Sequence, residues 1–320
     1  MSRILIVTVP SLSEENHSQI ADAARKQGFE VLFFEREEDA LPAVGEAEIL
    51  FSRSEKLARN SPHLRWQCTP TAGINHFLGE KVFASSDFVL TNSSGAYGVT
   101  IAEHVIMLTL EMLRRQPEYN GIVRSRTWIR NLPVRSIRNS RVTVLGTGDV
   151  GLECAIRLRA FEPADLTGVN RSGRNPEMRF DRIVQQDQLD TVLPETDILI
   201  ITLPGTDETF HMMDERRLGL LPDSALLVNV GRGTVVDQRA LEQELRAGRL
   251  FAALDVFEKE PLPAEDPLWD CPNLLITPHA AGNTTLPYTR ERIVELFLED
   301  FENYCAGRPL ARQVNLTAGY

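Results

Sequence analysis

The sequence predicts an α/β protein in which parallel sheets are covered by crossover helices. Short apolar runs alternate along the chain with longer segments whose apolar residues recur at helical spacing. One such run, Val142–Leu145, leads directly into the glycine-rich segment Gly146–Gly151 and then into a helix-like segment, Leu152–Phe161. A strand, a glycine-rich turn and a helix in this order are typical of a doubly wound, nucleotide-binding unit.

The residues before Gly146 are expected to form a separate α/β unit. Their first strand, Ile4–Val9, leads into Pro10–Ser13, which lacks the glycines of a phosphate-binding turn. The expected strands of this region are Ile4–Val9, Val31–Phe34, Ile49–Phe51, Leu64–Thr69 and Phe88–Thr91, and the expected helices are Glu15–Gln27 and Val99–Leu113.

The region from Val142 onward repeats the same alternation and ends in a long helix. Two α/β units, of which only the second has the glycine-rich turn, suggest a substrate domain and a cofactor domain with a cleft between them. The expected strands are Val142–Leu145, Asp165–Val169, Asp197–Thr202, Ala225–Val230, Phe251–Leu254 and Leu274–Thr277, and the expected helices are Leu152–Phe161, Asp214–Leu220, Asp237–Ala247 and Leu286–Tyr304.

Composition narrows the class of protein. The 320 residues are 42% hydrophobic and 25% charged, as in an ordinary soluble protein. A net charge of −11 argues against nucleic acid as a partner, and the arginine-rich stretch 124–138 is expected to be a solvated loop or contact surface. No run reaches the ~18 apolar residues that cross a bilayer, and the N-terminus is expected to be a strand, not a signal peptide. Four dispersed cysteines indicate reduced thiols in the cytoplasm, and no metal-ligand cluster is expected.

The glycine-rich turn predicts a dinucleotide site. Gly146 permits the tight turn, Gly148 lets the backbone approach a pyrophosphate, and Gly151 lets the helix pack close to the strand. The helix N-terminus then offers unpaired N–H groups and partial positive charge to the phosphates. The expected contacts are Gly146, Thr147, Gly148, Asp149, Val150 and Gly151.

The end of the next strand favours NADP(H) over NAD(H), which stays an alternative. Leu166–Val169 is followed by Asn170-Arg171-Ser172-Gly173-Arg174, without the carboxylate that usually binds the ribose 2′-hydroxyl. Guanidinium groups bind a 2′-phosphate well, and no carboxylate is present there to repel it. The expected contacts are Asn170, Arg171, Ser172 and Arg174.

Three later strands each lead to a polar group of a different kind. Arg232 follows the strand in VNVGRG, Glu260 the strand in LDVFEKEP, and His279 the strand in ITPHAAG. Ligands of a doubly wound sheet bind outside the carboxyl ends of its strands. These three side chains are therefore expected to converge on the crevice that holds the pyrophosphate.

Together these motifs resemble the D-isomer-specific 2-hydroxyacid dehydrogenase family over essentially the whole chain. The resemblance rests on the internal glycine fingerprint, VNVGRGTVVD, ALDVFEKEPLP with PLWDCPN after it, and TPHAAG. It implies a Rossmann-type doubly wound cofactor domain, residues 99–284, inserted into a flavodoxin-like α/β substrate domain, residues 1–98 and 285–320. It also implies a homodimer.

The resemblance implies roles for the three polar residues. Arg232 would bind the carboxylate and carbonyl oxygen of a 2-oxo acid, His279 would donate the proton to the carbonyl, and Glu260 would hydrogen-bond His279. Hydride arriving at a 2-oxo carbon leaves charge on oxygen, which calls for an acid that titrates near neutrality. A neighbouring carboxylate orients such an imidazole and favours its charged form. Glu258 competes as the partner of His279, but the family pattern favours Glu260.

Further contacts follow from the same resemblance. Thr71–Asn75 resembles the family's carboxylate-binding loop, with Ala72, Gly73 and Ile74 as the expected contacts, or else is a simple turn. Asp255 would receive the nicotinamide carboxamide, Asn229 would be structural, and Thr100 would either reach the nicotinamide or cap its helix. The remaining cofactor contacts expected are Leu203 and Pro204 on the adenine side, Val230, Gly231, His279 and Gly282.

The leading hypothesis is an NADP-preferring 2-oxo acid reductase that makes D-2-hydroxy acids, with glyoxylate, hydroxypyruvate and bulkier acids all open. Formate-type enzymes have Gln in place of Glu260, and phosphite-type enzymes have Lys in place of Ala72, so both are disfavoured. A 3-phosphoglycerate dehydrogenase-like enzyme is less expected because the extra regulatory domain of many such enzymes is absent. A redox-sensing regulator of the corepressor type remains the alternative of another class. The histidines expected to be surface or structural are His17, His63, His76, His104 and His211.

Overall fold

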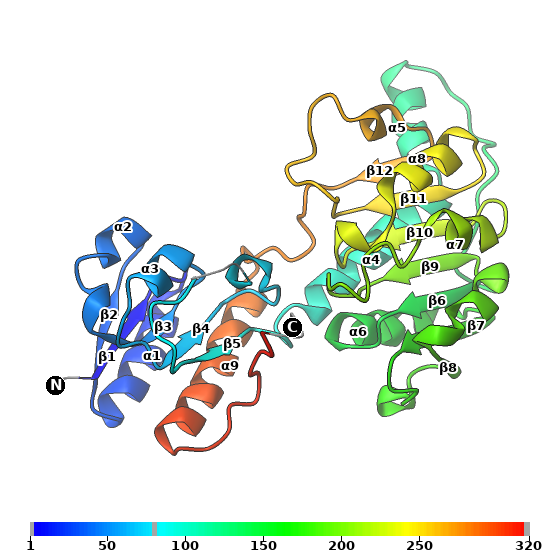
Figure 1. The fold of residues 1–320 in the computed structure, drawn as a ribbon. Helices are drawn as coiled ribbons and strands as arrows, with labels where there is room; N and C mark the ends of the chain where they lie inside the picture. The colour runs from blue at the N-terminus through cyan, green and yellow to red at the C-terminus, as the bar shows by residue number, and fades with distance from the viewer. Residues whose placement is uncertain (1–2, 79–81, 317–320) are drawn as a thin grey trace. The chain divides into compact units, whose positions relative to one another are not determined.

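The computed structural model describes residues 3–78 and 82–316, which divide into two compact units (Figure 1). Unit 1 is made of Met1–Tyr97 and Asn283–Tyr320, and unit 2 is Gly98–Gly282. The chain thus leaves unit 1, forms all of unit 2 and returns. The domain boundaries expected from the sequence, 98/99 and 284/285, lie one and two residues after these changeovers, and the roles assigned to the two domains stay predictions.

Unit 1 is built on a five-stranded parallel sheet with the order β2-β1-β3-β4-β5. This is the strand order of the flavodoxin-like fold, so the expected fold class is confirmed. Its strands are β1 (Arg3–Val7), β2 (Phe29–Phe33), β3 (Ala47–Phe51), β4 (Trp66–Cys68) and β5 (Val89–Thr91), and its α-helices are α1 (Glu14–Lys26), α2 (Glu37–Ala40), α3 (Glu55–Arg59) and α9 (Pro287–Cys305).

Helix α9 completes unit 1 from the far end of the chain. Phe297 stacks on Phe51 of β3 with ring centroids 4.1 Å apart and on Trp66 of β4 at 5.3 Å. Such aromatic contacts contribute about 0.5–1.5 kcal/mol each beyond the area that they bury. The helical spacing of Ile293, Phe297 and Phe301, all buried, places them on the face that packs against the sheet.

Unit 2 is built on a seven-stranded parallel sheet with the order β12-β11-β10-β9-β6-β7-β8. Strand order reverses between β6 and β9, which is the switch point of a doubly wound Rossmann sheet. Its strands are β6 (Arg141–Leu145), β7 (Asp165–Asn170), β8 (Arg182–Gln185), β9 (Ile198–Ile201), β10 (Leu226–Asn229), β11 (Phe251–Leu254) and β12 (Leu274–Ile276), and its α-helices are α4 (Gly98–Leu113), α5 (Gln116–Arg124), α6 (Asp149–Leu158), α7 (Glu215–Leu220) and α8 (Gln238–Arg246).

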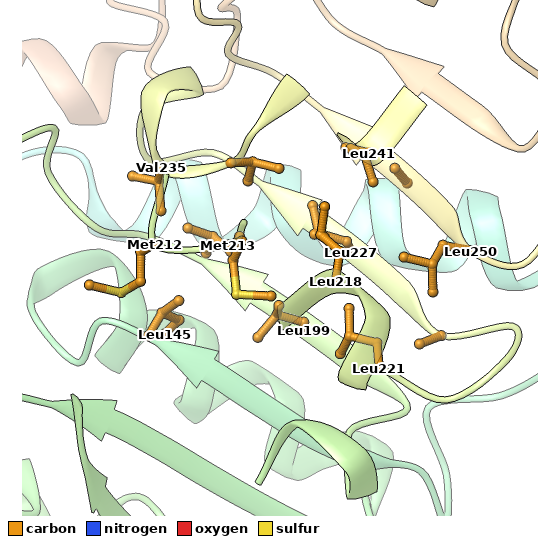
Figure 2. Packing of buried hydrophobic residues seen from close by; sticks show 14 of the residues in the cluster. Leu145, Leu199, Met212, Met213, Leu218, Leu221, Leu227, Val235, Leu241 and Leu250 are labelled. Atoms are coloured by element: carbon orange, nitrogen blue, oxygen red, sulfur yellow. The ribbon is translucent and has the colours of Figure 1, made fainter. Parts of the chain in front are cut away.

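Both faces of this sheet are buried, because alternate residues of each strand enter opposite cores. Figure 2 shows one face, where Leu145, Leu199 and Leu227 of three neighbouring strands lie among side chains that include Leu218 and Leu241 of α7 and α8. On the other face, the neighbouring strand residues pack with α4 and α6 in a second cluster. The sheet is thereby fixed from both sides, and the loops at its carboxyl edge project from a rigid support.

The sequence-based element assignment needs three corrections. The helices α2, α3 and α5 and the edge strand β8 are additional to the expected elements, because all four are short. Several strands end one or two residues earlier than their apolar runs, as at Val230, which is buried but lies outside the ladder. Thr100 lies inside α4, which begins at Gly98, so its alternative role as a helix cap is wrong. Within the described residues, no helix combines the length and hydrophobicity needed to cross a membrane.

Candidate active site

Three neighbouring strands of unit 2 bring the three expected catalytic side chains to one edge of the sheet. Arg232 lies in the loop after β10, Glu260 in the turn after β11, and His279 directly after β12. The three strands are parallel and adjacent, so their carboxyl ends share an edge. Three loops that are distant in the sequence therefore lie at the same edge of the sheet.

Glu260 is the partner of His279. Atom Oε2 of Glu260 lies 2.6 Å from Nδ1 of His279, while Oε1 accepts a hydrogen bond from the backbone N–H of Phe257 at 3.0 Å. The competing carboxylate, Glu258, instead lies 3.0 Å from Nε2 of His211 and accepts from the backbone N–H of Gln238 at 2.9 Å. Because a carboxylate only accepts hydrogen bonds, Nδ1 of His279 has the proton of that pair, and Nε2 is left for chemistry.

Arg232 is held close to Glu260 by tight packing of the two loops. A side chain at Gly233 would overlap the backbone of Phe257, so only glycine permits this approach. Asn229 braces the loop, because its Nδ2 donates to the carbonyl of Arg232 at 3.0 Å. Burial lowers the pKa of the Arg232 guanidinium, and the charge of Glu260 opposes that shift. Arginine stays protonated under such shifts, so a fixed positive charge lies beside the histidine pair.

Asp255 anchors the turn that carries His279. Its side chain is 1% exposed; Oδ1 accepts from the backbone N–H of Ala280 at 2.8 Å and Oδ2 from that of Ala281 at 3.1 Å. Its Oδ1 also accepts from the hydroxyl of Thr277 at 2.6 Å. A carboxylate oxygen has two lone pairs, so Oδ2 retains capacity for one more donor, as the expected contact with a carboxamide requires.

The glycine-rich turn after β6 fits a dinucleotide pyrophosphate. Gly146 has φ +103°, and a Cβ atom at Gly151 would overlap the carbonyl oxygen of Gly146. At Gly148, by contrast, an added Cβ would meet nothing within 4 Å, so the backbone faces open space just where α6 begins. The carboxylate of Asp149 packs against Gly98 at the start of α4. An open backbone cradle at a helix N-terminus is the arrangement that binds phosphates.

The loop after β7 is ordered around Asn170. Its Nδ2 donates to the hydroxyl of Thr147 at 2.7 Å and to the carbonyl of Arg174 at 2.9 Å, and its Oδ1 accepts from the N–H of Gly173 at 2.7 Å. Asn170 is thus committed to organising the loop, while Ser172, Arg171 and Arg174 are exposed on it. Glu208, from the loop after β9, lies 3.3 Å from Arg171.

The remaining expected contacts are distributed over both units. In unit 1, Thr71 and Asn92 donate to the carbonyls of Gly73 and Ala72 at 2.8 and 2.9 Å. Because N–H and C=O of one peptide point in opposite directions, the N–H groups of Gly73 and Ile74 face away from these bonds. The contacts in unit 2 are the buried Thr100 in α4, Leu203 and Pro204 after β9, Val230 and Gly231 after β10, and Gly282 at the end of the His279 turn.

His104, which is expected to be surface or structural, lies close to the turn of His279. Its Nε2 lies 3.1 Å from Oγ1 of Thr277 and 3.6 Å from Oδ1 of Asp255, beside the turn of His279. The signal in the sequence is weak, because His104 is one of several polar residues in a mainly apolar helical segment.

Comparisons with known proteins show which family the chain is similar to. Residues 106–281 match the family model described as D-isomer specific 2-hydroxyacid dehydrogenase, NAD binding domain. The chain is 31% identical over 289 residues to glyoxylate/hydroxypyruvate reductase B of Yersinia pestis (strain Pestoides F), covering 87% of this chain and 88% of that protein.

Two solved structures extend the likeness to the whole fold. A D-isomer specific 2-hydroxyacid dehydrogenase family protein from Aeromonas salmonicida subsp. salmonicida is 31% identical, with a TM-score of 0.86 over 99% of this chain and 100% of that chain. A D-isomer specific 2-hydroxyacid dehydrogenase from Xanthobacter autotrophicus, solved in complex with NADPH and MES, is 27% identical, with a TM-score of 0.81 over 100% of both chains.

Proposed function

Because the chain belongs to the D-isomer specific 2-hydroxyacid dehydrogenase family, we propose that it transfers a hydride between NADP(H) and a small 2-oxo acid/D-2-hydroxy acid pair. The observation that carries this proposal is the pairing of His279 with Glu260 at 2.6 Å, with the partly buried Arg232 close to that pair. A regulator that only senses the dinucleotide has no need of such a set. The relatives named as reductases likewise favour this function over the regulatory and 3-phosphoglycerate alternatives.

Each of the three side chains has a distinct task in this reaction. Arg232 binds the substrate carboxylate and carbonyl oxygen through two parallel donors. His279 holds a proton at Nε2 for the carbonyl oxygen during reduction and takes one back in the reverse direction. Glu260 fixes the ring through Nδ1 and stabilises the proton that remains there. When bound, NADPH supplies the hydride.

NADP(H) is the preferred cofactor in this proposal, with NAD(H) as the alternative. The open backbone at Gly148 and the N-terminus of α6 would bind the pyrophosphate, and Arg171, Ser172 and Arg174 would bind the 2′-phosphate. The complex of the Xanthobacter protein with NADPH supports this preference. The acceptor capacity left on Oδ2 of Asp255 suits the carboxamide.

We propose glyoxylate and hydroxypyruvate as the substrates to examine first. The curated relative from Yersinia pestis has these two acids in its name. The loop Ala72–Ile74 of unit 1 would offer backbone N–H groups to the substrate carboxylate, because its carbonyls are engaged by Thr71 and Asn92.

The proposed assembly is a homodimer formed through the segment that follows α4. Val123, Trp128, Ile129 and Val134 are 71%, 92%, 50% and 44% exposed, an unusual concentration of large apolar side chains on one segment. A second copy of the chain would cover them. Light scattering on the purified protein tests this: Trp128→Lys is expected to shift the mass from dimer to monomer, and a monomeric wild type contradicts it.

A cytoplasmic location is proposed from the cysteines. All four are free, and burial raises the pKa of Cys68 and of Cys154 to about 12, so these two thiols resist oxidation. Unpaired cysteines are the usual state in a reducing compartment. Fractionation of the producing cell tests this location. Recovery of the protein outside the cytoplasmic fraction would contradict it.

The proposed activity is tested by following NADPH and NADH absorbance with a panel of 2-oxo acids. We expect oxidation of NADPH with glyoxylate or hydroxypyruvate, a slower rate with NADH, and a D-configured product from hydroxypyruvate. If no 2-oxo acid of the panel is turned over with either NADPH or NADH, the proposed activity is wrong.

A further inference from the structure

The turn that carries His279 holds an uncommon backbone conformation. His279 has φ +52°, a region that residues other than glycine rarely adopt without support from their surroundings. The support comes from Asp255, whose backbone carbonyl accepts the N–H of His279 at 2.8 Å and whose carboxylate accepts the N–H groups of Ala280 and Ala281. The position of the histidine therefore depends on how firmly the Asp255 carboxylate is itself held.

The carboxylate is held in turn by Thr277. The hydroxyl of Thr277 has a single proton, and it is donated to Oδ1 of Asp255 at 2.6 Å. Atom Oγ1 of Thr277 also lies 3.1 Å from Nε2 of His104. Because its proton is already donated to Asp255, Oγ1 must accept in this contact, and Nε2 of His104 must have a hydrogen. The hydrogen bonds thus run in one direction, from His104 through Thr277 to Asp255.

His104 is placed for this contact by α4. Its side chain is 16% exposed, and its neighbours on the helix, Ala102 and Val105, are fully buried in the core beneath the sheet. Its Nε2 also lies 3.6 Å from Oδ1 of Asp255, so the ring that contacts the hydroxyl is close to the carboxylate as well. A histidine that served only to fill the core would not need a donor at this place.

We propose that His104 is a positioning residue, which acts through Thr277 and Asp255 to hold His279 in the orientation needed for proton transfer. The inference rests on the proposed role of His279 as the proton donor. His104 itself touches neither substrate nor cofactor in this proposal. Loss of its donor would leave the Thr277 hydroxyl free to rotate away from Asp255 and would loosen the turn.

The substitutions His104→Leu and His104→Gln separate the donor from the packing. Both residues are good helix formers. The amide nitrogen of Gln can donate from about the place of Nε2, whereas Leu fills the space and donates nothing. Thr277→Ser and Thr277→Val form the matching pair at the next position, because Ser keeps the hydroxyl and Val keeps the shape.

The experiment measures kcat with hydroxypyruvate and NADPH, the NADPH Kd by fluorescence, and hydrogen–deuterium exchange of the 277–282 amides, all in the full-length protein. We expect kcat to fall roughly 10-fold to 100-fold in His104→Leu and Thr277→Val, the loss expected when one buried hydrogen bond is broken. Faster exchange of the Ala280 and Ala281 amides should accompany it. His104→Gln and Thr277→Ser should stay within about 3-fold of wild type in kcat, and the NADPH Kd should change less than kcat in every variant.

Two outcomes overturn the inference: wild-type kcat and exchange in His104→Leu, or equal impairment of His104→Leu and His104→Gln. The second outcome would mean that the histidine is needed for its shape. If His104→Leu does not fold, the comparison of Thr277→Val with Thr277→Ser decides in the same way. A wild-type protein without turnover contradicts the proposed function instead, and the exchange data still decide whether His104 holds the turn.

Discussion

Atom Nδ1 of His279 lies 2.6 Å from Oε2 of Glu260, although the two residues are 19 positions apart in the sequence. The other carboxylate oxygen is bound by the N–H of Phe257 within the same turn. One side of the imidazole is therefore fixed by a carboxylate that cannot easily reorient, and Nε2 is left to exchange a proton with the substrate.

Glu260→Gln removes the charge of this pair and keeps its shape. We expect kcat/KM for the 2-oxo acid to fall roughly 100-fold or more, since general acid–base catalysis contributes about that much and an amide can offer a donor to the wrong ring tautomer. The matched control is Glu258→Gln, which weakens a partly exposed contact with His211 and should stay within about 3-fold of wild type. A larger loss in the control than in Glu260→Gln would assign the catalytic carboxylate to Glu258.

Two glycines of the same turn should respond to alanine in opposite ways. At Gly151 a Cβ atom would overlap the carbonyl oxygen of Gly146, so Gly151→Ala should lower the unfolding free energy by about 1–3 kcal/mol. At Gly148 the space is open and φ is −75°, so Gly148→Ala should keep the wild-type Tm but weaken NADPH binding by obstructing the pyrophosphate. Calorimetry and a fluorescence titration measure the two effects. Unchanged NADPH affinity in a folded Gly148→Ala would place the pyrophosphate elsewhere.

Glu208 should limit the preference for NADPH. Its carboxylate lies 3.3 Å from Arg171, where it competes with a 2′-phosphate for the guanidinium. Both side chains are exposed, so Glu208→Gln is expected to tighten NADPH binding only about 2-fold to 5-fold, the effect of a weak surface pair. Arg171→Ala should weaken NADPH binding and leave the NADH Kd nearly unchanged. Parallel changes in both Kd values would show that neither residue is near the 2′-phosphate.

Asp197 should make the stability of unit 2 sensitive to acid. Partial burial acts to raise the pKa of this carboxyl, but hydrogen bonds from the side chain and backbone of Arg141 outweigh it and hold the pKa below its ordinary value. The folded state therefore binds the proton less readily than the unfolded state. The ionised Asp197 carboxylate therefore stabilises the folded state above the unfolded pKa of about 3.9, and this stabilisation is lost as the pH falls through the folded pKa. The Tm difference between wild type and Asp197→Asn should shrink from neutral pH toward about pH 3; a constant difference contradicts this.

Much of the fold could be predicted because its signals are local. Buried parallel strands are short apolar runs, and the glycine-rich turn marks the one strand that starts the second unit. The strand β8 could not be found this way, because Arg182–Gln185 is a four-residue edge strand that is not buried. Helix α5 is nine residues long and none of its residues is buried, so no set of core-facing apolar residues marks it in the sequence.

The site was predictable to the extent that its residues follow strands directly. Each of the three follows an apolar run, as Arg232, Glu260 and His279 do after β10, β11 and β12. Because these strands are parallel and adjacent, their carboxyl ends lie at the same edge of the sheet. The choice between Glu258 and Glu260 could not be settled from the residues alone, because both lie in the same turn. The contact of His104 with Thr277 joins residues 173 positions apart, and no sequence pattern in either segment predicts it.

We propose that His279 gives its proton to a 2-oxo acid at this site, and a single-turnover measurement isolates that step. Enzyme saturated with NADPH is mixed with hydroxypyruvate or glyoxylate, and NADPH absorbance is followed for wild type and for His279→Gln. We expect rapid loss of NADPH in the wild type and a rate reduced roughly 100-fold or more in the variant, with NADPH affinity retained. Equal single-turnover rates in the two proteins would contradict it.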